Sequence, residues 1–134
     1  MSQKNFTEDQ IKSVFTDESQ KQAATAILQD KDKVEELVRK INRKLEKIPL
    51  VGSYFAAVPT LCLMVRDYVQ GTYTEVPFGT MIGIVLALLY FVSPIDIIPD
   101  GIPLLGLSDD AAVIAFALKM AHSDIEDYKE WKGV

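Results

Sequence analysis

Apolar residues recur at the spacing of one helical stripe between residues 30 and 48. The recurrence is every three or four positions, which is typical of an amphipathic helix. Its apolar members are Val34, Leu37, Val38, Ile41, Leu45 and Ile48. The opposite face carries basic residues, namely Arg39, Lys40, Arg43, Lys44 and Lys47. We therefore predict a basic amphipathic helix that ends before Pro49.

Two weaker helical patterns precede this helix. Residues 7–10 resemble a capping box, so a short helix is expected up to Phe15. A second predicted helix spans residues 17–29 and starts with Asp17 and Glu18, whose negative charge suits the N-terminal end of a helix. Its apolar content is small, so we expect this helix to be mobile or weakly docked.

The second half of the chain is far more apolar. A helix is predicted over residues 54–70, with Pro59 as a kink or a fresh start and Gly71 just after its end. Another should run over residues 77–92, because proline is tolerated at the first helical position. Ser108 is a good N-cap for a last helix that begins with acidic residues.

An apolar helical hairpin is the most distinctive feature of the sequence. Its two arms flank Pro94, Pro99 and Pro103, which remove amide donors and prevent one continuous helix. Aspartates alternate with these prolines in the turn. We therefore predict an all-α fold, a small helical bundle with an apolar hairpin around a Pro- and Asp-rich turn.

Composition and charge narrow the class of protein. The chain has 134 residues, 49% of them hydrophobic, and a net charge of -5, which argues against a nucleic-acid binder. The charge is uneven, so residues 1–48 are interpreted as a polar arm with amphipathic helices and residues 49–134 as an apolar helical body. A single cysteine, Cys62, allows no intrachain disulfide, and the polar residues 1–10 lack the apolar stretch of a signal peptide, so we expect no export. We expect a cytoplasmic protein, with association at the inner face of the membrane as an option.

The hairpin also carries a family resemblance. Residues 88–100 and 102–110 read LLYFVSPIDIIPD and IPLLGLSDD, and this order of prolines, aspartates and glycine resembles the YkvA-like family, the domain of unknown function numbered 1232. Arg66, Asp67 and Gly71 extend the resemblance to about residues 61–118. The resemblance implies a compact helical hairpin, often in membrane-associated proteins, and no established activity.

The apolar arms allow three arrangements. Residues 76–95 form a run of 20 residues without a charge, but the stretch from residue 80 would span only ~24 Å as a helix. Asp109 and Asp110 interrupt the second arm, and an acidic group near the bilayer centre is costly. The alternatives are a soluble bundle with a buried hairpin, a hairpin lodged in one leaflet, and a single spanning helix.

Two surfaces are candidates for binding. The basic residues Arg39, Lys40, Arg43, Lys44 and Lys47 suit an anionic membrane surface or a protein partner, or they form a solvated helix face. The aspartates Asp96, Asp100, Asp109 and Asp110 offer oxygen ligands for Mg²⁺ or Ca²⁺, or they cap the turn and the last helix. Arg66 is isolated among apolar residues and needs a carboxylate, so we expect a structural ion pair of Arg66 with Asp67 or a hairpin aspartate.

Nothing in the sequence indicates catalysis beyond these carboxylates. His122 is the single histidine, which excludes a histidine cluster for zinc, and no nucleophile motif or phosphate loop is present. The sequence predicts a non-catalytic interaction or membrane-surface module without a cofactor, able to form homo-oligomers. The alternative is a divalent-cation-binding protein or a metal-dependent hydrolase that uses the Asp cluster.

Overall fold

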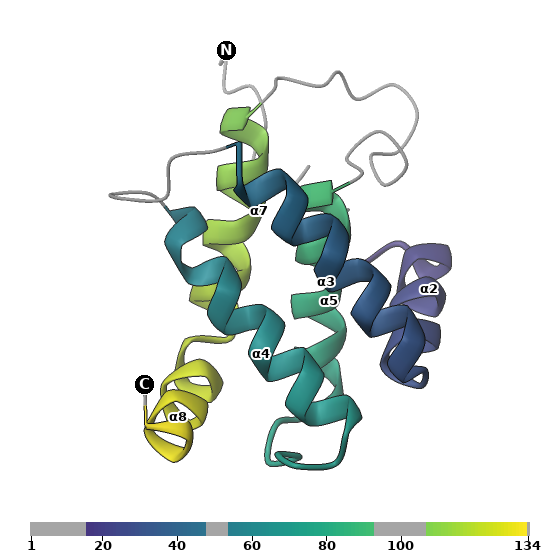
Figure 1. Cartoon of the computed structure of the whole chain (residues 1–134), viewed down its shortest axis with the longest axis vertical. Coiled ribbons are helices and arrows are strands. Elements are labelled where there is room, and N and C mark those ends of the chain that lie inside the picture. Colours follow the sequence, from purple (N-terminus) through teal and green to yellow (C-terminus); the bar gives the residue numbers. More distant parts are fainter. Residues whose placement is uncertain (1–15, 48–53, 93–106, 134) are drawn as a thin grey trace.

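The protein is an all-α bundle, as the sequence predicts. The computed structural model describes residues 16–47, 54–92 and 107–133 (Figure 1). No strand occurs in these three segments. The elements are α2 (Glu18–Leu28), α3 (Lys31–Leu45), the 3₁₀ helix η1 (Tyr54–Ala57), α4 (Val58–Val69), α5 (Phe78–Val92), α7 (Leu107–Met120) and α8 (His122–Lys132).

Some helices start or end at capping aspartates or a glycine that the sequence already shows. The side chain of Asp17 accepts hydrogen bonds from the amides of Ser19 and Gln20 at the start of α2. Asp30 caps α3 in the same way. After α4, Gly71 has a φ angle of 79°, the left-handed conformation that glycine adopts at low cost. The four-residue η1 lies before Pro59, so the predicted helix over residues 54–70 divides there.

Helix α5 is the centre of the bundle. It contacts α2, α3, α4 and α7, and Figure 1 shows it behind α3, with α7 and α2 on either side. All but two residues between Met81 and Val92 are buried, which explains why α5 carries no charged residue. The two arms of the predicted hairpin, α5 and α7, pack against each other. The predicted turn between them, residues 93–106, lies outside the described residues.

Residues 16–47, the described part of the polar first third of the chain, belong to this bundle. Helix α2 packs on α5, and its residues Ala24 and Leu28 are 0% and 5% exposed. The expected weak docking of residues 17–29 is therefore wrong, because a narrow apolar stripe is enough to hold α2 against an apolar helix. The helix expected before Phe15 lies outside the described residues.

Helices α7 and α8 complete the fold. Helix α7 begins at Leu107, so Ser108 lies in its first turn rather than at its cap. Ala121 separates α7 from α8, whose residues Ile125 and Tyr128 are buried against the bundle. The exposed face of α8 is acidic and includes Glu126, Asp127 and Glu130.

Candidate functional site: the basic face of α3 and the groove beside it

Helix α3 buries its apolar stripe in the bundle. Val34, Leu37, Val38 and Ile41 are all at most 6% exposed. The stripe packs on α4 and α5, so the helix is held by its apolar face and presents its charged face to solvent. A docked α3 therefore cannot insert its apolar side chains into a bilayer, as a free interfacial helix would.

Four of the five predicted basic residues lie on the solvent side. Arg39, Lys40 and Arg43 are exposed on α3, and Lys47 is exposed in the turn that follows it. Lys44 is half-buried instead. It donates a hydrogen bond to the backbone carbonyl of Phe91, and its ammonium lies 4.6 Å from the centroid of the Phe91 ring. The cation therefore stabilises the negative C-terminal end of α5.

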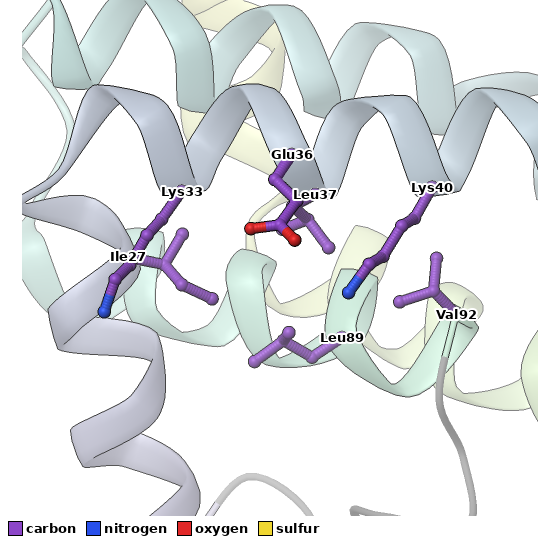
Figure 2. A pocket seen from close by; sticks show the side chains of 7 residues that line it. All are labelled: Ile27, Lys33, Glu36, Leu37, Lys40, Leu89 and Val92. Atoms are coloured by element: carbon purple, nitrogen blue, oxygen red, sulfur yellow. The ribbon is translucent and has the colours of Figure 1, made fainter.

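A groove of about 190 Å³ runs along one flank of α3. Figure 2 shows the seven side chains that line it, contributed by α2, α3 and α5. The apolar lining consists of Ile27, Leu37, Leu89 and Val92. Lys33, Glu36 and Lys40 supply the charged groups. The site thus joins an apolar floor to a rim with two cations and one anion.

Sequence reasoning missed Lys33 and Glu36 as members of this site. The spacing in the sequence could have revealed them. Residues 36, 37 and 40 follow residue 33 by three, four and seven positions, so all four share one flank of a helix. The spacing does not reveal which residues of other helices lie opposite this flank of α3. Ile27 and Leu89 come from other helices, and only the packed bundle places them beside Lys33 and Lys40.

Arg66 does not pair with Asp67. The guanidinium donates two hydrogen bonds of 2.7 Å to Glu35 on α3, from Nε to Oε2 and from Nη2 to Oε1. Adjacent residues on a helix point about 100° apart, so Arg66 faces α3 while Asp67 faces α8. The pair lowers the pKa of Glu35 and raises that of Arg66, with the hydrogen bond as the main cause in both.

Asp67 forms its own link between α4 and α8. It is 8% exposed and accepts hydrogen bonds from the Tyr128 hydroxyl at 2.6 Å and from the Lys132 ammonium at 3.1 Å. Burial first, and then the bond to Asp67, raises the pKa of Tyr128. The carboxylate is therefore satisfied by a phenol and a cation, and the Tyr73 and Trp131 rings pack around Tyr128.

The predicted cation site stays a prediction. Asp96 and Asp100 lie outside the described residues, and Asp109 and Asp110 lie in α7, with side chains that are also outside them. Within the described part of the chain, no group of His, Cys, Asp and Glu side chains is arranged to hold a metal ion. The structure therefore supplies no observation in favour of a metal-dependent activity.

Cys62 and His122 lie in different environments of the bundle. Cys62 is 5% exposed in the core, and burial raises the pKa of its thiol to about 12. A thiol with so high a pKa is a poor nucleophile at neutral pH. His122 is exposed at the start of α8.

No helix in the described segments has both the length and the apolar character needed to cross a bilayer. Helix α5 is the most apolar of them and has 15 residues, which corresponds to a length of about 22 Å. A bilayer core is roughly 30 Å thick. Within the described segments, α5 is in contact with α2, α3, α4 and α7.

Comparisons with known proteins identify the family. The family model described as "Protein of unknown function (DUF1232)" matches residues 80–116. The protein named "Uncharacterized membrane protein YkvA" of Bacillus subtilis (strain 168) is 36% identical over 75 residues, which cover 56% of this chain and 71% of YkvA. The chain belongs to the DUF1232 family. The resemblance read from residues 88–110 is thereby confirmed.

The family segment coincides with the centre of the fold. Residues 80–116 take in most of α5 and the first part of α7, the two helices that pack as a hairpin. The groove lies where this hairpin meets the preceding helices, because Leu89 and Val92 belong to the family segment and the lysines to α3. No solved structure matches the chain significantly.

Proposed function

We propose that the protein is a non-catalytic module that binds an anionic membrane surface from the cytoplasmic side through the basic face of α3. The observation that carries this proposal is the exposure of Arg39, Lys40, Arg43 and Lys47 on one docked helix and its following turn. A basic residue near an anionic bilayer contributes about 1 kcal/mol to binding. The related YkvA is itself named a membrane protein.

The distribution of charge favours one orientation. The whole chain has a net charge of -5, yet the acidic residues of α8 lie apart from α3, with α4 in contact with both helices (Figure 1). A bilayer that attracts the α3 face therefore repels the α8 face. The protein would approach the membrane with α3 toward the lipid headgroups and α8 toward the solvent.

The buried state of the apolar residues limits the mechanism. The stripe of α3 and most of α5 are covered by other helices, so docking requires no insertion of either. Binding is then mainly electrostatic and falls as salt is added, because the Debye length is about 10 Å at 0.1 M salt and about 3 Å at 1 M. Insertion of the hairpin would instead survive high salt.

The test is co-flotation of the detergent-free full chain with liposomes. Neutral vesicles of phosphatidylcholine are compared with vesicles containing phosphatidylglycerol, each at low and high salt. We expect flotation with the anionic vesicles at low salt, little at high salt and none with neutral vesicles. Flotation with neutral vesicles, or a failure to float with any vesicle, would contradict the proposal and direct the search to a protein partner.

A charge-matched pair of variants sharpens this test. The triple variant R39Q/R43Q/K47Q removes three positive charges from the α3 face, and K21Q/K119Q/K129Q removes three from α2, α7 and α8. The α3 variant should lose about 3 kcal/mol of binding, roughly a hundredfold in partitioning, and the control should lose much less. Equal losses would mean that net charge, and not this face, determines binding.

A further inference from the structure

The groove beside α3 combines features that the basic face alone does not require. Ile27, Leu89 and Val92 are only partly buried, although each is a large apolar side chain. They come from α2 and α5 and form a continuous apolar floor with Leu37. Such a floor contributes nothing to the attraction of headgroup charges. It suits a ligand that has an apolar part.

The charges at the rim suit a ligand that is also an anion. Lys33 and Lys40 are seven residues apart, so their Cα atoms are about 10 Å apart along α3. Figure 2 shows both side chains extending from α3 toward the floor, with the Glu36 carboxylate between them. Neither lysine forms an ion pair with a side chain of the described segments. The rim has two cations against one anion and therefore favours a singly charged headgroup.

The size and place of the groove define how a lipid would fit. Its volume of about 190 Å³ is too small for a whole phospholipid, so the groove would take part of one acyl chain. The remainder of the lipid would stay in the bilayer. Lys40 belongs both to the groove and to the exposed basic face, so the groove opens beside the surface that faces the membrane in the proposed orientation.

We propose that this groove holds a segment of one acyl chain of an anionic membrane phospholipid, with Lys33 and Lys40 bound to the phosphate. The inference rests on the proposed membrane function and names the ligand of the same surface. It adds to charge attraction a contact that requires an acyl chain and a headgroup of net negative charge in one molecule. Neutral phospholipid lacks the net negative charge, and glycerol phosphate lacks the acyl chain.

The test uses soluble short-chain lipids and NMR of the full chain. Dihexanoyl phosphatidylglycerol is titrated below its micelle concentration, with dihexanoyl phosphatidylcholine and glycerol phosphate as comparisons. We expect saturable shifts of the methyl signals of Ile27, Leu37, Leu89 and Val92 with the anionic lipid. The buried methyl groups of Val113 and Ile114, on α7, serve as internal controls. Equal shifts with phosphatidylcholine or with glycerol phosphate would overturn the proposal.

Two variants test the floor and the rim separately. K33Q/K40Q should weaken binding of the anionic short-chain lipid by about thirtyfold, whereas the control K21Q/K119Q should leave it within a few-fold. Leu89→Trp fills the groove without a change in charge and should abolish the shifts at Ile27 and Leu37. Circular dichroism and thermal melting verify that each variant is folded. Retention of lipid binding by folded L89W would overturn the assignment of the groove.

The experiments distinguish a failure of the lipid groove from a failure of the basic face as the docking surface. Flotation on anionic vesicles without methyl shifts at the groove removes the lipid groove and leaves electrostatic docking by α3 intact. Groove shifts with dihexanoyl phosphatidylglycerol, combined with equal flotation of R39Q/R43Q/K47Q and the wild-type chain, support the groove and remove the basic face as the docking surface.

Discussion

Arg66 on α4 forms two parallel hydrogen bonds, both 2.7 Å long, with the carboxylate of Glu35 on α3. The two residues are 31 positions apart in the sequence. The planar fork of the guanidinium matches the two carboxylate oxygens, so the pair specifies orientation as well as proximity. It therefore helps to set the angle at which α3 presents its basic face.

The Arg66–Glu35 pair should contribute little to stability despite this geometry. Its side chains are 34% and 40% exposed, so solvent screens the attraction and competes for both groups. We expect Arg66→Ala to lower the free energy of unfolding by about 1 kcal/mol or less, measured by urea denaturation at pH 7. A loss of stability several times larger would mean that the packing of α3 in the core depends on this pair.

The same pair predicts a pH dependence with a definite sign. Arg66 lowers the pKa of Glu35 below 4.5, its ordinary value. The ionised form is therefore favoured in the folded state, and its stabilising effect is complete above that value and lost as the pH falls through the lowered pKa. The stability difference between the wild-type chain and Glu35→Gln should shrink below pH 4.5 in urea titrations. A difference that stays constant down to pH 3 would contradict the pairing.

The Asp67–Tyr128 contact should matter more than the Arg66–Glu35 pair. The carboxylate of Asp67 is 8% exposed and Tyr128 is fully buried. If the hydrogen bond between them is removed, water cannot easily replace it. Tyr128→Phe should cost about 1–2 kcal/mol in thermal or urea unfolding. Asp67→Ala should cost more, because it also leaves Lys132 without its carboxylate. If Tyr128→Phe proved neutral, the Asp67 carboxylate would be equally well satisfied without the hydroxyl, and the contact would not contribute to stability.

Truncation of α5 distinguishes a bundle core from a lipid-facing helix. Leu88 is 1% exposed, and Leu88→Ala should lower stability in detergent-free buffer by about 2–5 kcal/mol. The neighbouring Leu89→Ala is the matched control and should cost less, since Leu89 is only partly buried. Equal and small effects of the two variants would indicate that α5 is not packed in this way in solution.

Cys62 should be protected from thiol reagents in the folded protein. Burial both shields the sulfur and raises its pKa to about 12, so very little thiolate forms at pH 8. Reaction with a disulfide reagent should be slow in buffer and fast in urea, with the absorbance of the released thiol as the readout. A rapid reaction without denaturant would show that the segment around Cys62 opens readily.

The sequence by itself determined the helices and much of the surface chemistry. Periodicity of three and four residues is a local property, so the stripe of α3 and its basic face follow from residues 30–48 alone. The same holds for α5, where a long uncharged run ends at prolines. The family was also readable from the order of prolines and aspartates, because that pattern spans a contiguous segment and needs no knowledge of packing.

Only the tertiary structure decided which residues meet across helices. The choice of Glu35 for Arg66, the docking of α2 on α5, and the joining of Ile27, Leu89 and Lys33 in one groove depend on how the helices cross. Crossing angles result from the sum of many weak packing contacts distributed over the whole bundle. A helix pattern records which face is apolar, and it holds no information about the face that will cover it.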